Sequence, residues 1–476
     1  MNGDSGRAVL LAALVWVALV AVAVAVAGGG LGNDEAQYAL GARTLVGDDG
    51  GASGTDPYPL FRPIGMRVLA APGVLAGGGE LALRLPFVLI AMGYVALVWR
   101  LAWRLGGLDA VAGRRAAVLA VAVQVSAAPW LARSGEALSD LAATALLLGM
   151  VVLIVEDVAR ARARMATWLG VAVAGAAAFH VRYGSAPVIA MLVVGALVTL
   201  RERRAAVALA GAAMAAMMAP FLWWSHVRTG DVLGVLKVSE DAANRAYVGE
   251  GLVWYATQWG WGMAGPVMGA VALAGIVAAL RRPLPGPSPL PAPFYDLPLR
   301  RLLLATALGQ ILVLGLRAHG EARYVFFATT ILTVLGACWL AAHTRPRLRQ
   351  ITLALCALSA IAGAVFAVAR ADRMNDRRVA LMRASAAVRA DAAGASCVVM
   401  TGTQPQVAWY TRCRTRLLGI EPVVAEAAAG FERVYIVAGA GAPRQPEDGA
   451  ALSGPGVQFQ TLVCGERPRW CVWKAR

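Results

Sequence analysis

The sequence has little charge and almost no lysine. Only 15% of its 476 residues are charged, whereas 59% are hydrophobic. This balance excludes a water-soluble globular protein and a disordered chain, because neither exposes so much apolar surface with so few charges. Only two of the 44 basic residues, Lys237 and Lys474, are lysine. The abundance of Arg, Ala, Gly and Val is typical of a GC-rich bacterial genome.

A basic patch with interleaved aromatic side chains is also missing, although the formal net charge is +16. The arginines stand between apolar runs instead, and this excludes nucleic acid as a partner. No cysteine and histidine spacing matches a closed zinc site. The sequence therefore leaves the cofactor unknown, with a divalent metal ion between acids and a phosphate as one option.

Long apolar runs are what the chain does have. A bilayer core requires about 20 apolar residues per helix, and eleven segments approach this length. They lie at about residues 8–27, 80–99, 112–130, 137–155, 166–180, 185–200, 205–224, 262–280, 300–316, 324–342 and 351–369. The first run lacks the cleavage pattern of a signal peptide, so it counts as a span. We predict an α-helical polytopic membrane protein with about 11 transmembrane helices.

The arginines between the spans predict the orientation. With the N-terminus in the cytoplasm, eighteen arginines lie at inner helix ends and four in the three short outer loops. Basic residues concentrate on the cytoplasmic side in this way in membrane proteins generally. The sequence therefore predicts a multi-pass protein of the inner or plasma membrane with an extracytoplasmic C-terminus. Residues 1–370 would form its transmembrane domain, with outer loops at 28–79 and 225–261 and a Pro-rich inner spacer at 283–298.

The pattern changes after residue 370. Short β-type runs (SCVVMTG, RVYIVAG, VQFQTLVC and RWCVWK) and one expected helix near 404–411 predict a small extracytoplasmic α/β domain over residues 371–476. Four of the six cysteines fall in this tail, as an oxidising compartment favours: Cys397, Cys413, Cys464 and Cys471. They allow three pairings, of which one joins the sequence neighbours, and four unpaired thiols are the alternative.

Polar residues gather in four separate places on the predicted outer side. The clusters are Asp34 and Glu35 followed by Tyr38; Arg133, Glu136 and Asp140; His180, Arg182 and Tyr183; and Arg317, His319, Glu321, Arg323 and Tyr324. Charged groups at a membrane boundary are costly and tend to mark function. A carboxylate can take the proton of an acceptor hydroxyl that attacks a sugar, while Arg and His hold the departing phosphate. One cluster alone is typical of solvated surface, but the four together favour a reaction.

The outer loop 225–261 combines aromatic and basic side chains. They are Trp254, Tyr255, Trp259 and Trp261 with Lys237 and Arg245. One interpretation is an amphipathic segment that lies along the interface and closes over a lipid-linked donor. The other is the aromatic belt found at any membrane boundary.

Several of these segments resemble the GT-C glycosyltransferases. Within that superfamily the resemblance is to the protein O-mannosyltransferase, aminoarabinose transferase and RgtA-like group, over most of residues 1–345. It is carried by the acid pair with its following Tyr, by RPIGMRVLAAPGVLAGGGELALRLPFVLIAMGYVALVWRLAWRLGG at 62–107, by ARSGEALSDLAATALLLG at 132–149 and by HGEARYVFFATTILTVLGA at 319–337.

The resemblance implies an enzyme of the cell envelope, a hexosyl or pentosyl transferase that depends on a lipid phosphate sugar. Its donor would be a polyprenyl-phosphate-linked sugar in the membrane lipid, and its acceptor an extracytoplasmic glycan, lipid or protein. Transfer would invert the anomeric carbon.

The resemblance also implies roles for particular residues. Asp34 matches the acid that activates the acceptor, Glu35 its supporting neighbour, and Asp140 a second acid. The remaining candidates would contact the donor phosphate: Arg323 and Tyr324, with Arg182 and His319 beside them.

Two other functions fit part of the pattern. A transporter or flippase of lipid-linked saccharides also needs basic groups for phosphate, but the predicted spans are almost free of charge and no internal repeat is evident. A scaffold with a functional tail is the third possibility, although eleven spans exceed what an anchor requires.

Overall fold

The computed structural model of the chain describes residues 3–48, 62–107, 110–160, 162–241, 245–280, 297–417, 431–439, 459–466 and 469–475. The predicted spacer at 283–298 lies almost wholly outside these residues. So do residues 49–61 of the first predicted outer loop and 242–244 of the second.

The chain divides into two compact units, which we call the helical unit and the mixed unit. The helical unit contains Met1–Ala23, Leu60–Gly65 and Phe87–Val368. The mixed unit contains Val24–Pro59, Met66–Pro86 and Ala369–Arg476. The tail that the sequence separates after residue 370 is therefore grouped with most of the first predicted outer loop.

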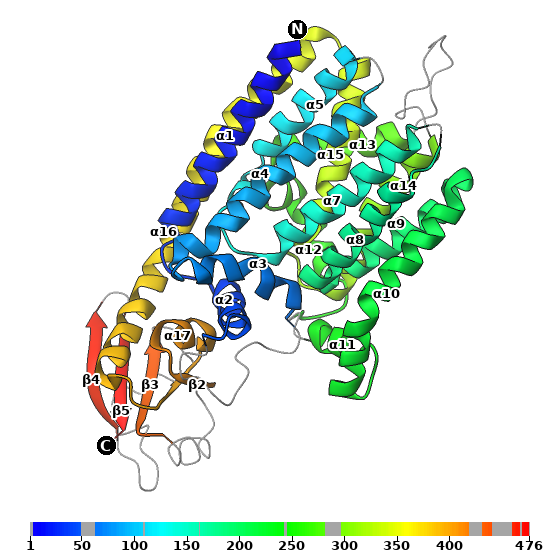
Figure 1. Ribbon diagram of the computed structural model, residues 1–476. Helices are drawn as coiled ribbons and strands as arrows, with labels where there is room; N and C mark the ends of the chain where they lie inside the picture. The colour runs from blue at the N-terminus through cyan, green and yellow to red at the C-terminus, as the bar shows by residue number, and fades with distance from the viewer. Residues whose placement is uncertain are drawn as a thin grey trace. The chain divides into compact units, whose positions relative to one another are not determined.

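Helices account for nearly all described residues of the helical unit (Figure 1). They are α5 (Ala110–Val125), α6 (Ala128–Leu131), α7 (Ser139–Val158), α8 (Met165–Val181), α9 (Ala186–Thr199), α10 (Arg204–Thr229), α11 (Gly234–Asp241), α12 (Glu250–Gln258), α13 (Pro266–Leu280), α14 (Leu297–Arg317) and α15 (Phe326–His343). Four helices cross the division between the units: α1 (Gly3–Ala27), α3 (Ile64–Leu75), α4 (Glu80–Leu105) and α16 (Pro346–Ala392).

Helices are present at all the predicted apolar segments. Each of the eleven predicted segments coincides with a helix, and seven described helices are long and apolar enough to cross a membrane: α1, α4, α7, α10, α14, α15 and α16. The other four segments form the shorter helices α5, α8, α9 and α13, so the number of spans stays a prediction. The polytopic helical fold is confirmed.

Glycine allows close helix packing in the helical unit between α13 and α15. A Cβ at Gly275 would lie 2.0 Å from the carbonyl oxygen of Leu332, and one at Gly336 would lie 2.0 Å from that of Val271. Small residues let membrane helices approach until their backbones touch. The two glycines are therefore required by this contact.

The mixed unit contains a five-stranded sheet in the order β2-β1-β3-β5-β4. The strands are β1 (Cys397–Thr401), β2 (Arg414–Leu417), β3 (Arg433–Gly439), β4 (Phe459–Glu466) and β5 (Arg469–Ala475). β1 pairs in parallel with β2 and β3, whereas β5 pairs antiparallel with β3 and β4. The helix α17 (Gln404–Thr411) connects β1 to β2. The predicted small α/β domain is confirmed.

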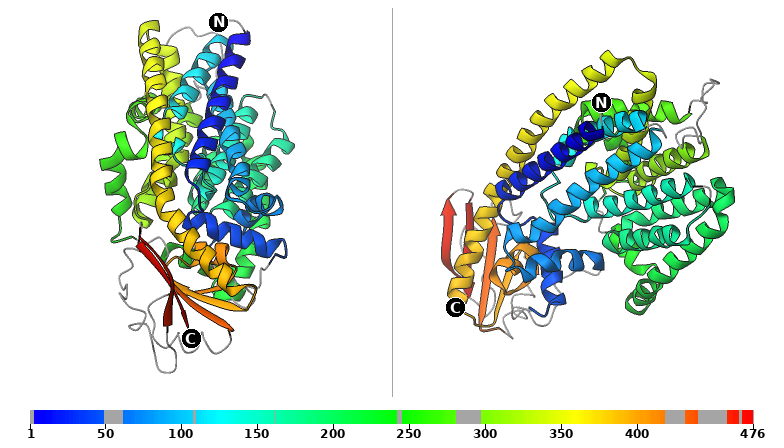
Figure 2. Two further views of the ribbon diagram at one scale, coloured as in Figure 1. Left: turned by 90° about the vertical axis from the view of Figure 1, so that its left-hand side faces the viewer. Right: turned by 45° about the horizontal axis from the view of Figure 1, so that its top comes forward.

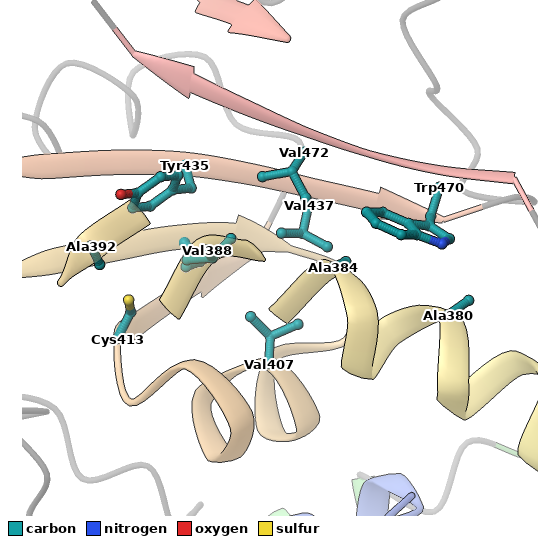
Figure 3. Packing of buried hydrophobic residues seen from close by; sticks show 11 residues of the cluster. Ala380, Ala384, Val388, Ala392, Val407, Cys413, Tyr435, Val437, Trp470 and Val472 are labelled. Atoms are coloured by element: carbon teal, nitrogen blue, oxygen red, sulfur yellow. The ribbon is translucent and has the colours of Figure 1, made fainter. Parts of the chain in front are cut away.

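The end of α16 covers one face of this sheet (Figure 3). Its buried residues recur every four positions, at Ala380, Ala384, Val388 and Ala392, so they form one stripe along the helix. Val407 of α17 and the inward residues of β3 and β5 complete this core. At 47 residues α16 is one continuous helix of about 70 Å (Figure 2), and the predicted span 351–369 occupies only its first half.

The four tail cysteines form two disulfides between sequence neighbours. Cys397 is bonded to Cys413, and Cys464 to Cys471. The first bond joins the start of β1 to the residue before β2, and so it encloses α17. The second crosses directly paired positions of β4 and β5.

Candidate active site

Asp140 and Arg182 are positioned by two helix ends of the helical unit. Asp140 lies in the first turn of α7, where its negative charge stabilises the helix N-terminus. Arg182 follows the last residue of α8 in an extended conformation. Nη1 of Arg182 is 2.5 Å from Oδ1 of Asp140. The Asp140 side chain is 3% exposed and that of Arg182 is 22% exposed, so a ligand can reach the guanidinium more easily than the acid.

Arg323 and Tyr324 approach the same carboxylate from a 3₁₀ turn, Ala322–Val325, just before α15. Nε of Arg323 is 3.8 Å from Oδ2 of Asp140. The Tyr324 ring centre lies 4.8 Å from the guanidinium carbon of Arg182 and 5.4 Å from that of Arg323. Four residues predicted from separate parts of the sequence are thus brought together.

His319 and Glu321 extend this cluster. Nε2 of His319 is 3.4 Å from the hydroxyl of Tyr324 and 3.9 Å from Oε2 of Glu321. Nε of Arg323 donates to the same Glu321 oxygen at 2.8 Å. The predicted residue His319 is therefore part of the same cluster.

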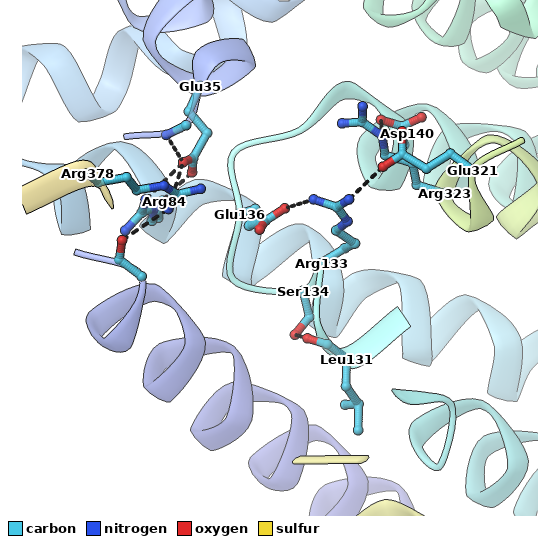
Figure 4. A network of polar contacts seen from close by, with 12 residues as sticks. Glu35, Arg84, Leu131, Arg133, Ser134, Glu136, Asp140, Glu321, Arg323 and Arg378 are labelled. Atoms are coloured by element: carbon cyan, nitrogen blue, oxygen red, sulfur yellow. Dashed lines mark hydrogen bonds and ion pairs between the residues drawn. The ribbon is translucent and has the colours of Figure 1, made fainter. Parts of the chain in front are cut away.

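Arg133 bridges two acids beside it (Figure 4). It donates to Oε2 of Glu136 at 2.7 Å and to Oε1 of Glu321 at 2.6 Å. Burial acts to lower the pKa of Arg133, but the carboxylates of Glu136 and Glu321 outweigh it and raise that pKa. The sequence places these three residues in the polar clusters of the outer side but gives none of them a role in catalysis or phosphate binding.

The charges of this cluster balance one another. Three guanidinium groups face three carboxylates, namely Arg133, Arg182 and Arg323 with Glu136, Asp140 and Glu321. The carboxylates fix the guanidinium planes, and a guanidinium has five N–H donors in a rigid fork that matches phosphate. Arg182, held by Asp140 and Ser139 through Nη1, is oriented for such a ligand.

Asp34 and Glu35 belong to the mixed unit. Both lie in the first turn of α2 (Asn33–Leu45). Glu35 is buried, and its Oε2 accepts the backbone N–H of Gly32 at 2.8 Å. A glutamate at this position that reaches back to the N-cap fixes the helix start.

Two arginines hold Glu35 in place (Figure 4). Nε and Nη2 of Arg84 donate to its two carboxylate oxygens at 2.8 and 2.9 Å, and Nη1 of Arg378 lies 3.9 Å away. These contacts hold the Glu35 carboxylate in place beside Asp34, which is half-buried. The catalytic roles of Asp34, Glu35 and Asp140 stay predictions.

Sequence reasoning missed Arg84 and Arg378. Arg84 could have been identified from the sequence, because it is an ionisable residue inside the predicted span 80–99, where such residues are rare and tend to be functional. No sequence feature distinguishes Arg378, because it is one of many arginines after residue 370.

No described residues form a group of three or more His, Cys, Asp or Glu side chains that could hold a metal ion. The divalent ion between acids and phosphate stays a prediction.

Comparison of structures identifies the fold. ArnT from Cupriavidus metallidurans in the apo state superposes with a TM-score of 0.72 at 16% identity, over 99% of this chain and 98% of ArnT. ArnT bound to undecaprenyl phosphate gives 0.71 at 15% identity, with the same coverage. The chain has the GT-C fold.

A more distant similarity supports this conclusion. The archaeal oligosaccharyltransferase AglB from Archaeoglobus fulgidus, in complex with an inhibitory peptide and a dolichol-phosphate, gives a TM-score of 0.55 at 13% identity, over 90% of this chain and 69% of AglB. ArnT and AglB are both GT-C glycosyltransferases. No protein-family model and no curated protein sequence matches the chain. The GT-C resemblance expected from the sequence is confirmed at the level of the fold.

Proposed function

We propose that this chain is a membrane glycosyltransferase that moves a sugar from a polyprenyl-phosphate-linked donor to an extracytoplasmic acceptor, with inversion at the anomeric carbon. The observation that carries the proposal is the pairing of Arg182 and Arg323 with one buried carboxylate, Asp140, in a GT-C fold. ArnT, which has this fold, has been crystallised with undecaprenyl phosphate.

The arginine cluster supplies what the departing phosphate requires. Negative charge grows on the phosphate oxygens as the bond from the sugar C1 to the phosphate oxygen breaks. Preorganised guanidinium groups stabilise that charge without reorganising during the reaction. Arg182 and Arg323 donate to the phosphate in this scheme, and Tyr324 and His319 add a hydroxyl and an imidazole.

Asp34 is the candidate base. Its carboxylate accepts the proton of the acceptor hydroxyl while the acceptor oxygen bonds to C1 from the face opposite the phosphate. The phosphate leaves with the bonding electrons as polyprenyl phosphate, so the atoms and charges balance. The sequence resemblance supports this role, and so does the fixed start of α2, because a base must be held in a defined position.

Turnover of lipid-linked donors tests the proposal. The purified full chain in lipid nanodiscs is incubated with radiolabelled polyprenyl-phosphate mannose, glucose, arabinose and aminoarabinose, together with a cell-envelope extract that supplies the acceptor, and release of free polyprenyl phosphate is measured. EDTA in a parallel reaction tests the divalent ion. We expect one donor to be consumed and Arg182→Met to slow its turnover by about 10²-fold or more.

Arg203→Met is the matched control. Arg203 also pairs with a buried aspartate of the helical unit, Asp157, at 3.4 Å, but it is not part of the site. Equal turnover in the two variants would contradict the phosphate-binding role. Movement of an intact donor across the bilayer without cleavage would instead identify a flippase.

A further inference from the structure

Three consecutive glycines, Gly28, Gly29 and Gly30, link α1 to the segment that starts α2, and side chains from distant parts of the mixed unit bind their carbonyls. Nη1 of Arg378, on α16, donates to the carbonyls of Gly28 and Gly30, each at 3.0 Å. Arg84 donates to those of Gly29 at 2.8 Å and Gly30 at 3.0 Å. The two arginines thus define the path of the chain just before the acid pair.

The glycine turn lies so close to the tail that no side chain fits. A Cβ at Gly30 would be 2.7 Å from Sδ of Met382, 3.1 Å from Cβ of Arg378 and 3.2 Å from the Tyr410 hydroxyl. Gly29 has φ +49°, a conformation that favours glycine. The close approach therefore favours glycine at position 30, and the backbone conformation favours it at position 29.

The helix α17 makes the next contact along the chain. The backbone N–H of Leu31 donates to the Tyr410 hydroxyl at 2.7 Å. Burial and the neighbouring Glu80 raise the pKa of Tyr410, so the hydroxyl stays protonated. Trp409 packs into the cluster that contains Leu31 and Leu40.

A second contact joins α17 to the far end of α2. The Arg43 guanidinium donates to the carbonyl of Trp409 at 3.0 Å and stacks 3.5 Å above its ring. One short helix of the small α/β domain thus binds both the residue just before α2 and the far end of α2. The Cys397–Cys413 bond fixes that helix between β1 and β2.

We propose that the C-terminal α/β domain is a positioning element of the transferase site. Its residues Tyr410 and Arg378 hold the start of α2 and therefore the Asp34 carboxylate. The inference rests on the proposed function, because it takes Asp34 as the base. Under this proposal the tail contributes to turnover by positioning the base. It does not act by binding the acceptor or by stabilising the fold alone. Tyr410 and Arg378 act through the backbone of residues 28–31 and do not touch the substrate.

Two measurements on the full chain in nanodiscs test this. Hydrogen exchange of the amides of residues 29–36 reports the position of the turn without any substrate. The second measurement is turnover of the donor that the wild-type protein accepts, with kcat and KM determined separately. The test variants are Tyr410→Phe, which removes the acceptor of the Leu31 N–H, and Arg378→Lys, which keeps the charge but loses the fork.

Matched controls come from the same domain. Tyr435→Phe and Arg433→Lys remove contacts to Asp391, where the Tyr435 hydroxyl is 2.5 Å and Arg433 Nη1 3.1 Å from Oδ2. Neither residue contributes to the contacts with α2 described above. A general loss of stability in the α/β domain would therefore affect test and control variants alike.

In both test variants the amides of residues 29–36 should exchange about tenfold faster than in the wild type. The kcat of both variants should fall about 10²-fold, with an unchanged KM for the donor. Both controls should match the wild type. Turnover equal to that of the controls, or unchanged exchange, would overturn the positioning role. If Arg182→Met and Asp34→Asn still slow turnover in that case, the proposed function stands. No turnover of any donor by the wild type overturns the proposed function and this inference with it.

Discussion

At the scale of single residues, an ion pair hidden from water holds the acid pair in place. The side chains of Glu35 and Arg84 are 2% and 1% exposed. Arg84 uses its remaining donors on backbone carbonyls, including that of Ala25 at 2.7 Å. A buried pair is costly to form, but removing one partner leaves the other charge buried and uncompensated. The pair therefore ties α2 to α4 only while both members are present.

Glu35→Gln should destabilise the mixed unit by about 3–5 kcal/mol. The neutral amide removes the charge that compensates Arg84, and the Gly32 cap weakens. Thermal unfolding of the purified chain, followed by circular dichroism, measures the effect. Glu156→Gln is the control, since its partner Arg100 is 47% exposed and exposed pairs contribute about 0–1 kcal/mol. A Tm loss no larger than that of the control would contradict the structural role of Glu35.

The sequence shows which residues are unusual but not which residues meet. Asp140, Arg182, Arg323 and Tyr324 stand out because each is polar beside an apolar run, and the structure brings them together. The partner of Glu35 could not be inferred, because the pair joins positions 49 residues apart. Hydropathy describes each segment alone and does not predict which segments pack.

At the scale of elements, α17 links the sheet to the helix that begins with the acid pair. A single disulfide encloses it, with a sequence separation of 16 residues between Cys397 and Cys413. The other disulfide, Cys464–Cys471, closes only the β4–β5 hairpin. Because a disulfide restricts the unfolded chain more when its loop is longer, the first bond contributes more to stability.

Removal of the first disulfide should loosen α17. In Cys397→Ser/Cys413→Ser, amides of α17 and of the start of α2 exchange faster, and turnover falls. In Cys464→Ser/Cys471→Ser the change stays within β4 and β5, and turnover is retained. Hydrogen exchange and donor turnover of both double variants check this. Equal effects on α2 from the two variants would contradict a specific link through α17.

The contact between α13 and α15 depends on glycine. Gly336→Ala places a methyl group against the backbone of Val271, and overpacking of this kind costs about 1–3 kcal/mol. Gly149→Ala in α7 is the matched control, because a Cβ there would meet no atom within 4 Å and alanine favours helix. Thermal unfolding should show a lower Tm for the first variant only. An unchanged Tm in Gly336→Ala would contradict the close helix contact.

At the scale of the whole molecule, the sequence predicted the classes of structure well. Long apolar runs predict membrane helices because few other structures satisfy their backbone in lipid, and alternating short runs predict strands. The described chain has both, with the GT-C fold. What sequence reasoning did not predict is that the tail and the first loop form one unit. Contacts such as Leu31 with Tyr410 join positions 379 residues apart, and local patterns carry no information about them.

The central claim is that the chain breaks the bond between a sugar and a polyprenyl phosphate with Asp34 as the base. Its most direct test compares turnover of the accepted polyprenyl-phosphate sugar by the wild-type protein and by Asp34→Asn, at equal amounts of folded protein. The account predicts release of polyprenyl phosphate by the wild type and a rate lower by about 10²–10⁴-fold in the variant. Unchanged turnover in Asp34→Asn would contradict it.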